Sequence, residues 1–134
     1  MNGVLWHNPR CSKSRQALDL LSRKGHAPEV REYLREPPDA EEILRLARIL
    51  GLPVRALLRE GEPEYAELGL ADPSLDDAAL AEAMARHPRL IQRPILVCGD
   101  RAVIGRPPER VLELIEGAGR TTGGSEAVRE RGGD

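Results

Sequence analysis

Near its N-terminus the chain reads GVLWHNPRCSKSR over residues 3–15, and the expected fold can be built outward from this stretch. Its apolar beginning, residues 3–6, predicts a short strand, and the Asn-Pro pair that follows is a turn signal. From Ser12 onward the apolar residues recur at helical spacing. The pattern therefore places Cys11 between the end of a strand and the first turn of a helix.

The rest of the chain alternates between strand-like and helical patterns, with a helical middle and two strands near the end. Those two strands are separated by Gly-Asp, which predicts a hairpin with a two-residue turn. The expected elements are a strand over 28–33, a helix capped by Asp39 and ended by Gly51, short helical pieces over 54–58 and 64–68, a helix opened by Ser74 and Asp77 that ends near residue 87, strands over 95–98 and 101–104, and a last helix that starts at Pro107-Pro108.

The order of these elements is β-α-β, a helical block, and then β-β-α. Without residues 38–90, what remains has the order of a minimal thioredoxin fold. We therefore expect an α/β protein with a thioredoxin-like fold, in which helices flank a mixed four-stranded sheet. Residues 1–117 would form a single domain with a helical insertion over about 38–90. Residues 118–134 have no periodic apolar face, so we expect a disordered tail there.

Length and composition limit the classes of protein to which the chain can belong. It has 134 residues, and its net charge of −2 provides no overall electrostatic attraction to nucleic acid or to an anionic membrane surface. No apolar run approaches the roughly 20 residues that span a bilayer, and the first residues lack the features of a secretory signal. We expect a cytoplasmic protein without a nucleic-acid or membrane partner.

The two cysteines, Cys11 and Cys98, lie far apart in the sequence, and a reducing cytosol disfavours a disulfide between them. Neither belongs to a Cys-x-x-Cys pair, and no group of Cys and His has the spacing of a zinc site. We therefore expect neither a bound metal nor a bound cofactor. Cys98 follows three apolar residues at the end of a predicted strand, and we expect it to be inert.

Cys11 lies where a thiolate is favoured. Free backbone N–H groups and the positive end of the helix dipole stabilise negative charge at a helix N-terminus, and they could also hold an oxyanion. Arg10, Lys13 and Arg15 add positive charge nearby, as does His7 if it is protonated. Such surroundings lower the pKa of a cysteine and make it nucleophilic at neutral pH. A lone cysteine is often a small buried residue, but charged neighbours on both sides argue against burial here.

Three polar neighbours of Cys11 leave alternatives open. His7 either tunes the cysteine or is simply a polar residue at the edge of the strand. Ser14 either donates a hydrogen bond to the thiolate, which we favour, or lies in the first helical turn without a role. Ser12 is expected to do no more than cap the helix.

An oxyanion beside Cys11 needs positive charge from elsewhere in the chain. The Cys-x5-Arg motif of low-molecular-weight phosphatases is absent, because the residue six after Cys11 is an alanine. Arg59, Arg93 and Arg106 stand out by context, since the first ends a helical piece and each of the others precedes a proline. A thioredoxin-like fold would hold a cis proline at Pro94, facing the cysteine. Taken singly, each arginine of so arginine-rich a chain is best interpreted as a solvated surface residue.

Four motifs in register resemble the glutaredoxin-linked arsenate reductase family, and the similarity runs from residue 3 to about residue 116. They are His-Asn-Pro-x-Cys at 7–11, Val-Arg-Ala-Leu-Leu-Arg at 54–59, Arg-Pro-Ile at 93–95 and Gly-Arg-Pro-Pro-Glu at 105–109. The resemblance implies a thioredoxin-like fold with a helical insertion and a Cys11 nucleophile.

The same resemblance implies roles for other residues. Arg59, Arg93 and Arg106 occupy the positions of the family's anion-binding arginines. His7 and Ser14 correspond to the family's His and Ser near the cysteine. The best-characterised members carry Gly-Thr-Ser after the cysteine, whereas this chain has Ser-Lys-Ser, a form similar to a sister branch of the family.

The reaction that the resemblance implies is the reduction of arsenate to arsenite. The Cys11 thiolate would attack arsenate with loss of water, glutathione would attack the arsenic, and glutaredoxin would reduce the mixed species. An external thiol is needed because Ser14 leaves no resolving cysteine three residues after Cys11.

Two other functions stay open. A general glutathione-linked thiol oxidoreductase that acts on glutathionylated proteins permits Cys-x-x-Ser, but it leaves the three arginines without a purpose. A non-enzymatic regulator of similar fold that binds RNA polymerase would sense oxidation through Cys-x-x-Cys, and Ser14 removes the second thiol of that switch.

Overall fold

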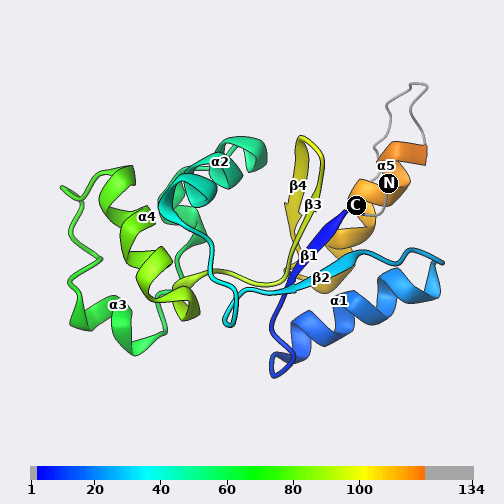
Figure 1. The fold of residues 1–134 in the computed structure, drawn as a ribbon, viewed down its shortest axis with the longest axis horizontal. Coiled ribbons are helices and arrows are strands. Elements are labelled where there is room, and N and C mark those ends of the chain that lie inside the picture. Colours follow the sequence, from blue (N-terminus) through cyan, green and yellow to red (C-terminus); the bar gives the residue numbers. More distant parts are fainter. Residues whose placement is uncertain (1–2, 120–134) are drawn as a thin grey trace.

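The computed structural model describes residues 3–119, and four strands form one mixed sheet in the order β2-β1-β3-β4 (Figure 1). Strand β1 (Val4–His7) pairs in parallel with β2 (Glu29–Glu32) and antiparallel with β3 (Ile95–Cys98). Strand β3 in turn pairs antiparallel with β4 (Arg101–Ile104). This is the thioredoxin-like sheet that the sequence predicts.

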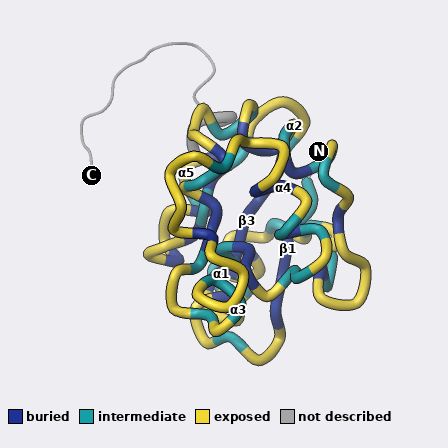
Figure 2. Tube along the Cα trace, turned by 90° about the vertical axis from the view of Figure 1, so that its left-hand side faces the viewer, coloured by how far each residue is buried: buried dark blue, intermediate teal, exposed yellow. Residues whose placement is uncertain are grey.

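Both faces of the sheet are covered by helices, because successive strand residues point to opposite sides. Leu5 and Leu96 belong to an apolar cluster with α1 (Ser12–Arg23), the 3-10 turn η3 (Pro108–Val111) and α5 (Leu112–Gly119). Trp6 and Ile95 belong to the cluster on the other face, beneath α2 (Ala40–Leu50). Figure 1 shows α1 and α5 on one side of the sheet and α2 on the other. Burial is greatest along the central strands β1 and β3 (Figure 2).

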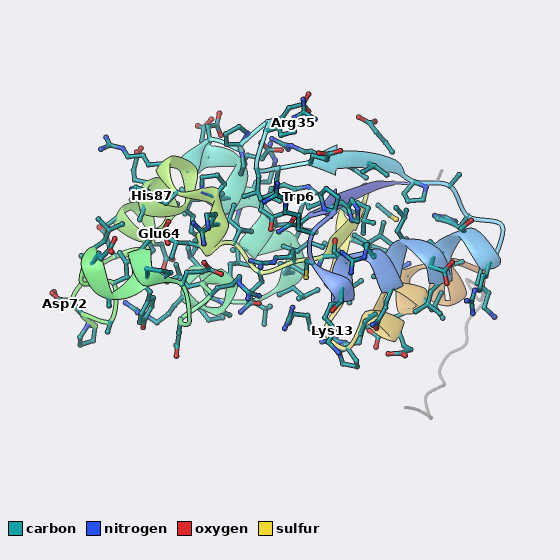
Figure 3. All side chains as sticks on the ribbon, turned by 90° about the horizontal axis from the view of Figure 1, so that it is seen from below. Trp6, Lys13, Arg35, Glu64, Asp72 and His87 are labelled. Atoms are coloured by element: carbon teal, nitrogen blue, oxygen red, sulfur yellow. The ribbon has the colours of Figure 1, made fainter. Side chains whose placement is uncertain are left out.

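Between β2 and β3 the chain is helical and packs as one unit against the sheet. Apolar residues of this unit share a cluster with Trp6 and Tyr33. In Figure 3 Trp6 lies near the middle of the molecule, between the unit that carries Glu64 and His87 and the helix that carries Lys13. The elements of the unit are α2, η1 (Val54–Leu57), α3 (Pro63–Glu67), α4 (Asp77–Arg86) and η2 (Pro88–Leu90).

Local signals set the ends of these helices. The Asp39 carboxylate accepts a hydrogen bond from the N–H of Glu42 at 2.8 Å, and Gly51 ends α2 in the left-handed conformation, as the sequence predicts. The prediction that Ser74 opens α4 is wrong. Asp76 caps that helix by accepting a hydrogen bond from the N–H of Ala79. The hydroxyl of Ser74 instead donates to the carboxylate of Asp72.

Several element boundaries differ by one or two residues from the sequence expectation, among them the ends of β1 and α5. Strand β1 ends at His7, one residue later than predicted, so this histidine is part of the sheet. Helix α5 runs to Gly119 and includes the first two residues of the segment expected to be a tail; the rest of that segment, residues 120–134, lies outside the described residues. Within residues 3–119, no helix is long and apolar enough to cross a membrane.

Candidate active site

Cys11 is the N-cap residue of α1. Its backbone is extended, its N–H donates to the carbonyl of Asn8 at 2.9 Å, and its own carbonyl accepts from the N–H of Arg15 at 3.0 Å. Ser12 is the first helical residue rather than the cap, so the expectation that it caps the helix is wrong. The partly buried sulfur therefore lies at the open end of α1, where the first backbone N–H groups lack helical partners.

The pKa of the Cys11 thiol lies below its usual value. Burial is the largest single influence and acts the other way, but it is outweighed by the backbone N–H of Ser14, the Arg93 guanidinium and the backbone N–H of Lys13 together. Arg93 lowers this pKa both as a side-chain donor and through its positive charge. These groups stabilise the thiolate form.

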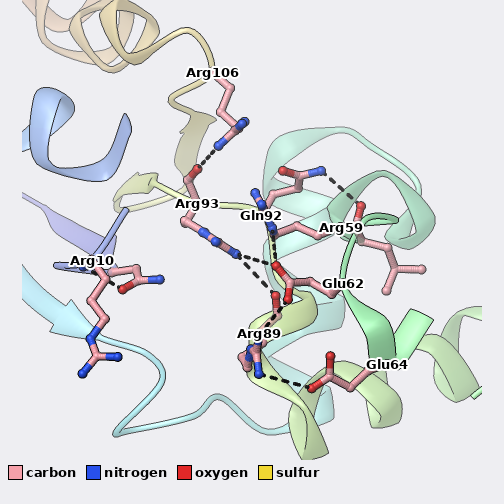
Figure 4. Close-up of polar contacts among 10 residues, drawn as sticks. Arg10, Arg59, Glu62, Glu64, Arg89, Gln92, Arg93 and Arg106 are labelled. Carbon is pink, nitrogen blue, oxygen red and sulfur yellow. Dashed lines mark hydrogen bonds and ion pairs between the residues drawn. The ribbon is translucent and has the colours of Figure 1, made fainter. Parts of the chain in front are cut away.

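The basic side chains next to Cys11 in the sequence are not the leading influences on its pKa. Arg10, Lys13 and Arg15 are all exposed, and Arg15 donates instead to the carbonyl of Pro9 at 2.8 Å. The guanidinium of Arg10 points away from the arginine cluster (Figure 4). The positive charge that acts most on the sulfur comes from a residue distant in sequence, Arg93.

His7 and Ser14 are buried beneath the cysteine loop and contact each other. The Ser14 Oγ lies 2.7 Å from His7 Nδ1 and accepts from the N–H of Asn8 at 3.0 Å. Burial lowers the pKa of His7, with Glu32 opposing this and Arg15 adding to it, so the imidazole is neutral at neutral pH. It therefore does not supply the positive charge considered for it. Ser14 reaches the sulfur through its backbone N–H, not through the hydroxyl as we favoured, because His7 and Asn8 engage the hydroxyl.

The structure brings the three predicted arginines together around Arg93, whose side chain is only 13% exposed (Figure 4). Arg106 donates through Nη1 to the carbonyl of Arg93 at 3.1 Å. Arg59 donates through Nε to Glu62 Oε2 at 3.3 Å, and Arg93 Nη1 lies 3.8 Å from the same oxygen. Three separate segments thus contribute arginines to one cluster, and its central member, Arg93, acts on Cys11.

Glu62 is a member of the site that sequence reasoning missed. Its carboxylate joins Arg59 to Arg93 through one oxygen, and its other oxygen lies 3.2 Å from Arg89 Nη2. The side chain is 14% exposed, which is low for an acidic residue. The chain contains 22 acidic residues, and no local pattern distinguishes this one from the rest.

The peptide bond between Arg93 and Pro94 is cis, as expected from its place before β3. Pro94 is buried, and its carbonyl accepts from the N–H of Gly105 at 2.8 Å. A second cis bond joins Arg106 to Pro107. In the part of the chain that the structure describes, no three His, Cys, Asp or Glu side chains gather as a metal ion would require.

The fold and the site together define the class: a thioredoxin-like protein with a low-pKa cysteine at a helix N-terminus beside clustered arginines. Residues 6–114 match the model of the ArsC family, and the chain belongs to this family.

The chain is similar to individual members of this family over most of its length. The uncharacterized protein YfgD of Escherichia coli (strain K12) is 51% identical over 112 residues, which are 83% of this chain and 94% of the relative. An arsenate reductase of Neisseria meningitidis serogroup A is 47% identical over 112 residues, 83% of this chain and 96% of that protein. The solved structure of arsenate reductase from Vibrio cholerae superimposes with a TM-score of 0.80 at 55% identity, covering 82% of this chain and 94% of that one.

Proposed function

We propose that this protein is a cytoplasmic arsenate reductase that uses Cys11 as its nucleophile and glutathione and glutaredoxin as reductants. The observation that carries the proposal is the Arg93 guanidinium, which lowers the pKa of the Cys11 thiol and lies at the centre of the arginine cluster. Relatives named arsenate reductase, such as that of Neisseria meningitidis, support it. No bound metal or cofactor takes part, and glutathione acts as a co-substrate.

In the first step the Cys11 thiolate attacks the arsenic of arsenate. A sulfur–arsenic bond forms, and one arsenate oxygen takes up protons and leaves as water, so arsenic stays in its +5 state. Arg59, Arg93 and Arg106 offset the negative charge of the remaining oxygens, because guanidinium groups pair well with tetrahedral oxyanions. The free N–H groups at the start of α1 offer further donors.

In the second stage the thiol of glutathione displaces another oxygen as water, and arsenic is then bound to two sulfurs. A glutaredoxin thiolate attacks the glutathione sulfur, forming a mixed disulfide, and the electron pair of the broken sulfur–arsenic bond reduces arsenic to the +3 state. Water then releases arsenite and regenerates the Cys11 thiol. External thiols are required because Ser14 stands where a resolving cysteine would lie, and the partly buried Cys98 packs against the apolar cluster between the sheet and α1.

The direct test is arsenite production by the purified full chain with arsenate, glutathione and glutaredoxin, with each reductant also left out in turn. Cys11→Ser should abolish the activity and Cys98→Ser should retain it. Arg93→Ala should lower kcat/KM strongly, whereas Arg101→Ala, on the exposed edge strand β4, should not. A wild type that makes no arsenite but removes glutathione from glutathionylated proteins would instead establish the general thiol oxidoreductase.

A further inference from the structure

Two buried polar groups near Cys11 lack hydrogen-bond partners. Among the described residues, three buried side-chain atoms have none: the Tyr33 hydroxyl, the Arg93 Nε and one carboxylate oxygen of Glu64. The first two belong to residues that interact electrostatically with Cys11. Buried polar groups in proteins are nearly always paired, so two unpaired groups beside a reactive sulfur require an explanation.

The position of Tyr33 is fixed by its ring and not by its hydroxyl. The residue directly follows β2 and is completely buried. Its ring stacks on Trp6 with the centroids 6.4 Å apart and is part of the apolar cluster beneath α2. A phenylalanine would fill the same place, so packing alone does not account for the hydroxyl.

The Tyr33 hydroxyl is a hydrogen-bond donor without an acceptor. Burial raises the pKa of Tyr33 to about 12, against the opposing charges of Arg93 and Arg59, so the hydroxyl keeps its proton at neutral pH. Arg93 lies beside it without a hydrogen bond of regular geometry. A guanidinium carries only donors, so Arg93 cannot accept the tyrosine proton in any orientation.

The unpaired Nε–H of Arg93 is also a donor, and both donors belong to residues that interact electrostatically with the sulfur at which an oxyanion would be held. An oxyanion is the acceptor that this pair of donors lacks. We propose that Tyr33 is a substrate-contacting residue whose hydroxyl donates a hydrogen bond to an oxygen of the tetrahedral oxyanion held at Cys11, beside the Nε–H of Arg93. This inference rests on the proposed function in one respect only, namely that an oxyanion binds at Cys11.

Removing the hydroxyl should have opposite effects on stability and on anion binding. In Tyr33→Phe the ring still packs on Trp6 while a buried unpaired group disappears, so the variant should be as stable as the wild type or more stable. The same variant loses a hydrogen bond to a charged group, which corresponds to about a tenfold weaker affinity for the anion. A purely structural tyrosine would give the reverse, a loss of stability with unchanged anion affinity.

The test measures the rate at which iodoacetamide alkylates Cys11 in the full chain as arsenate or phosphate is titrated in without glutathione. Either anion should protect the wild type, and Tyr33→Phe should need about ten times more anion for the same protection. Tyr65→Phe, a half-buried tyrosine in α3, is the matched control and should behave as the wild type. Urea unfolding of the same three proteins gives the stability comparison.

Each outcome of this test either supports or overturns the proposed role of Tyr33. Equal protection of Tyr33→Phe and wild type, or a marked loss of its stability or folding, would overturn the assignment. A wild type that neither anion protects would overturn it together with the oxyanion site. If protection follows the expected order but no arsenite is produced with glutathione and glutaredoxin, the role of Tyr33 stands and the proposed reductase activity is wrong.

Discussion

The Nδ1 atom of His7 lies 2.7 Å from the Oγ atom of Ser14, and both side chains are buried. The contact joins the last residue of β1 to the first turn of α1. Because the same hydroxyl also accepts from the N–H of Asn8, it ties both ends of the loop that carries Cys11. The position of the sulfur relative to the sheet therefore depends on this pair.

Replacing Ser14 with alanine should destabilise the protein. The change leaves the His7 ring nitrogen and the Asn8 N–H buried without their partner, so the free energy of unfolding should fall by about 1–3 kcal/mol. Urea unfolding measures this directly. Ser12→Ala is the control, because Ser12 is exposed and should change stability by no more than about 0.5 kcal/mol. Equal effects of the two changes would show that the Ser14 hydroxyl does not stabilise the loop that carries Cys11.

Stability should also fall in mild acid because of His7. Burial, the strongest influence, lowers the pKa of this histidine in the folded protein. Below about pH 6.5 the unfolded chain therefore binds the proton more readily than the folded chain, so stability present at pH 7 is lost as pH falls through the folded pKa. Unfolding by urea between pH 7 and pH 5 should show this loss in the wild type and a flatter dependence in His7→Gln. Parallel curves for the two proteins would contradict it.

Most of the fold could be predicted because its signals are local. The hairpin strands Ile95–Cys98 and Arg101–Ile104 match the expected residues, and the Asp39 cap is formed as the motif indicates. The error at α4 arose among neighbouring residues with similar capping ability, since Ser74 and Asp76 can both accept from a helix N-terminus.

Much less of the site could be predicted, because its interactions join distant segments. The position of Cys11 at a helix start follows from local pattern, but the charge that acts on it comes from Arg93. Glu62 and Tyr33 carry no local signal, since their roles depend on which groups the folded chain places beside them. The neutral state of His7 likewise follows from burial, which the sequence around it did not indicate.

The arginine cluster predicts unequal effects for two acidic residues. Glu62 is 14% exposed and pairs with Arg59, Arg89 and Arg93, so Glu62→Ala should lower the free energy of unfolding by about 1–3 kcal/mol. Glu82, whose pair with Arg86 is exposed, is the control, and its alanine variant should stay within about 0.5 kcal/mol of the wild type. Urea unfolding of both variants makes the comparison. Similar small losses would mean that Glu62 does not hold the cluster together.

Gly3 should not tolerate a side chain, because it lies against β3. Its φ is +77°, and an added Cβ would lie 2.5 Å from the carbonyl oxygen of Val97 and 2.6 Å from the Cys98 sulfur. Gly99 has a similar φ of +64° but open space around it. Both alanine variants carry the backbone cost, so the crowding should make Gly3→Ala less stable than Gly99→Ala by about 1–3 kcal/mol. Equal losses by thermal or urea unfolding would show that β1 and β3 adjust freely.

The two cysteines should differ in reactivity in a way that isolates Arg93. Burial raises the pKa of Cys98, with Arg101 opposing it, whereas the helix N–H groups and Arg93 hold the pKa of Cys11 below its usual value. The rate of alkylation by iodoacetamide is followed from pH 5 to pH 10, with each site quantified by peptide mass spectrometry. The pH at which this rate is half-maximal, the midpoint, should be lower for Cys11 than for Cys98. Because a thiolate and not a thiol reacts, Arg93→Ala should move the Cys11 midpoint to higher pH and leave that of Cys98 in place. A Cys11 midpoint unmoved by this change would assign the activation to the helix N-terminus alone, and Arg93 would then act only on the bound anion.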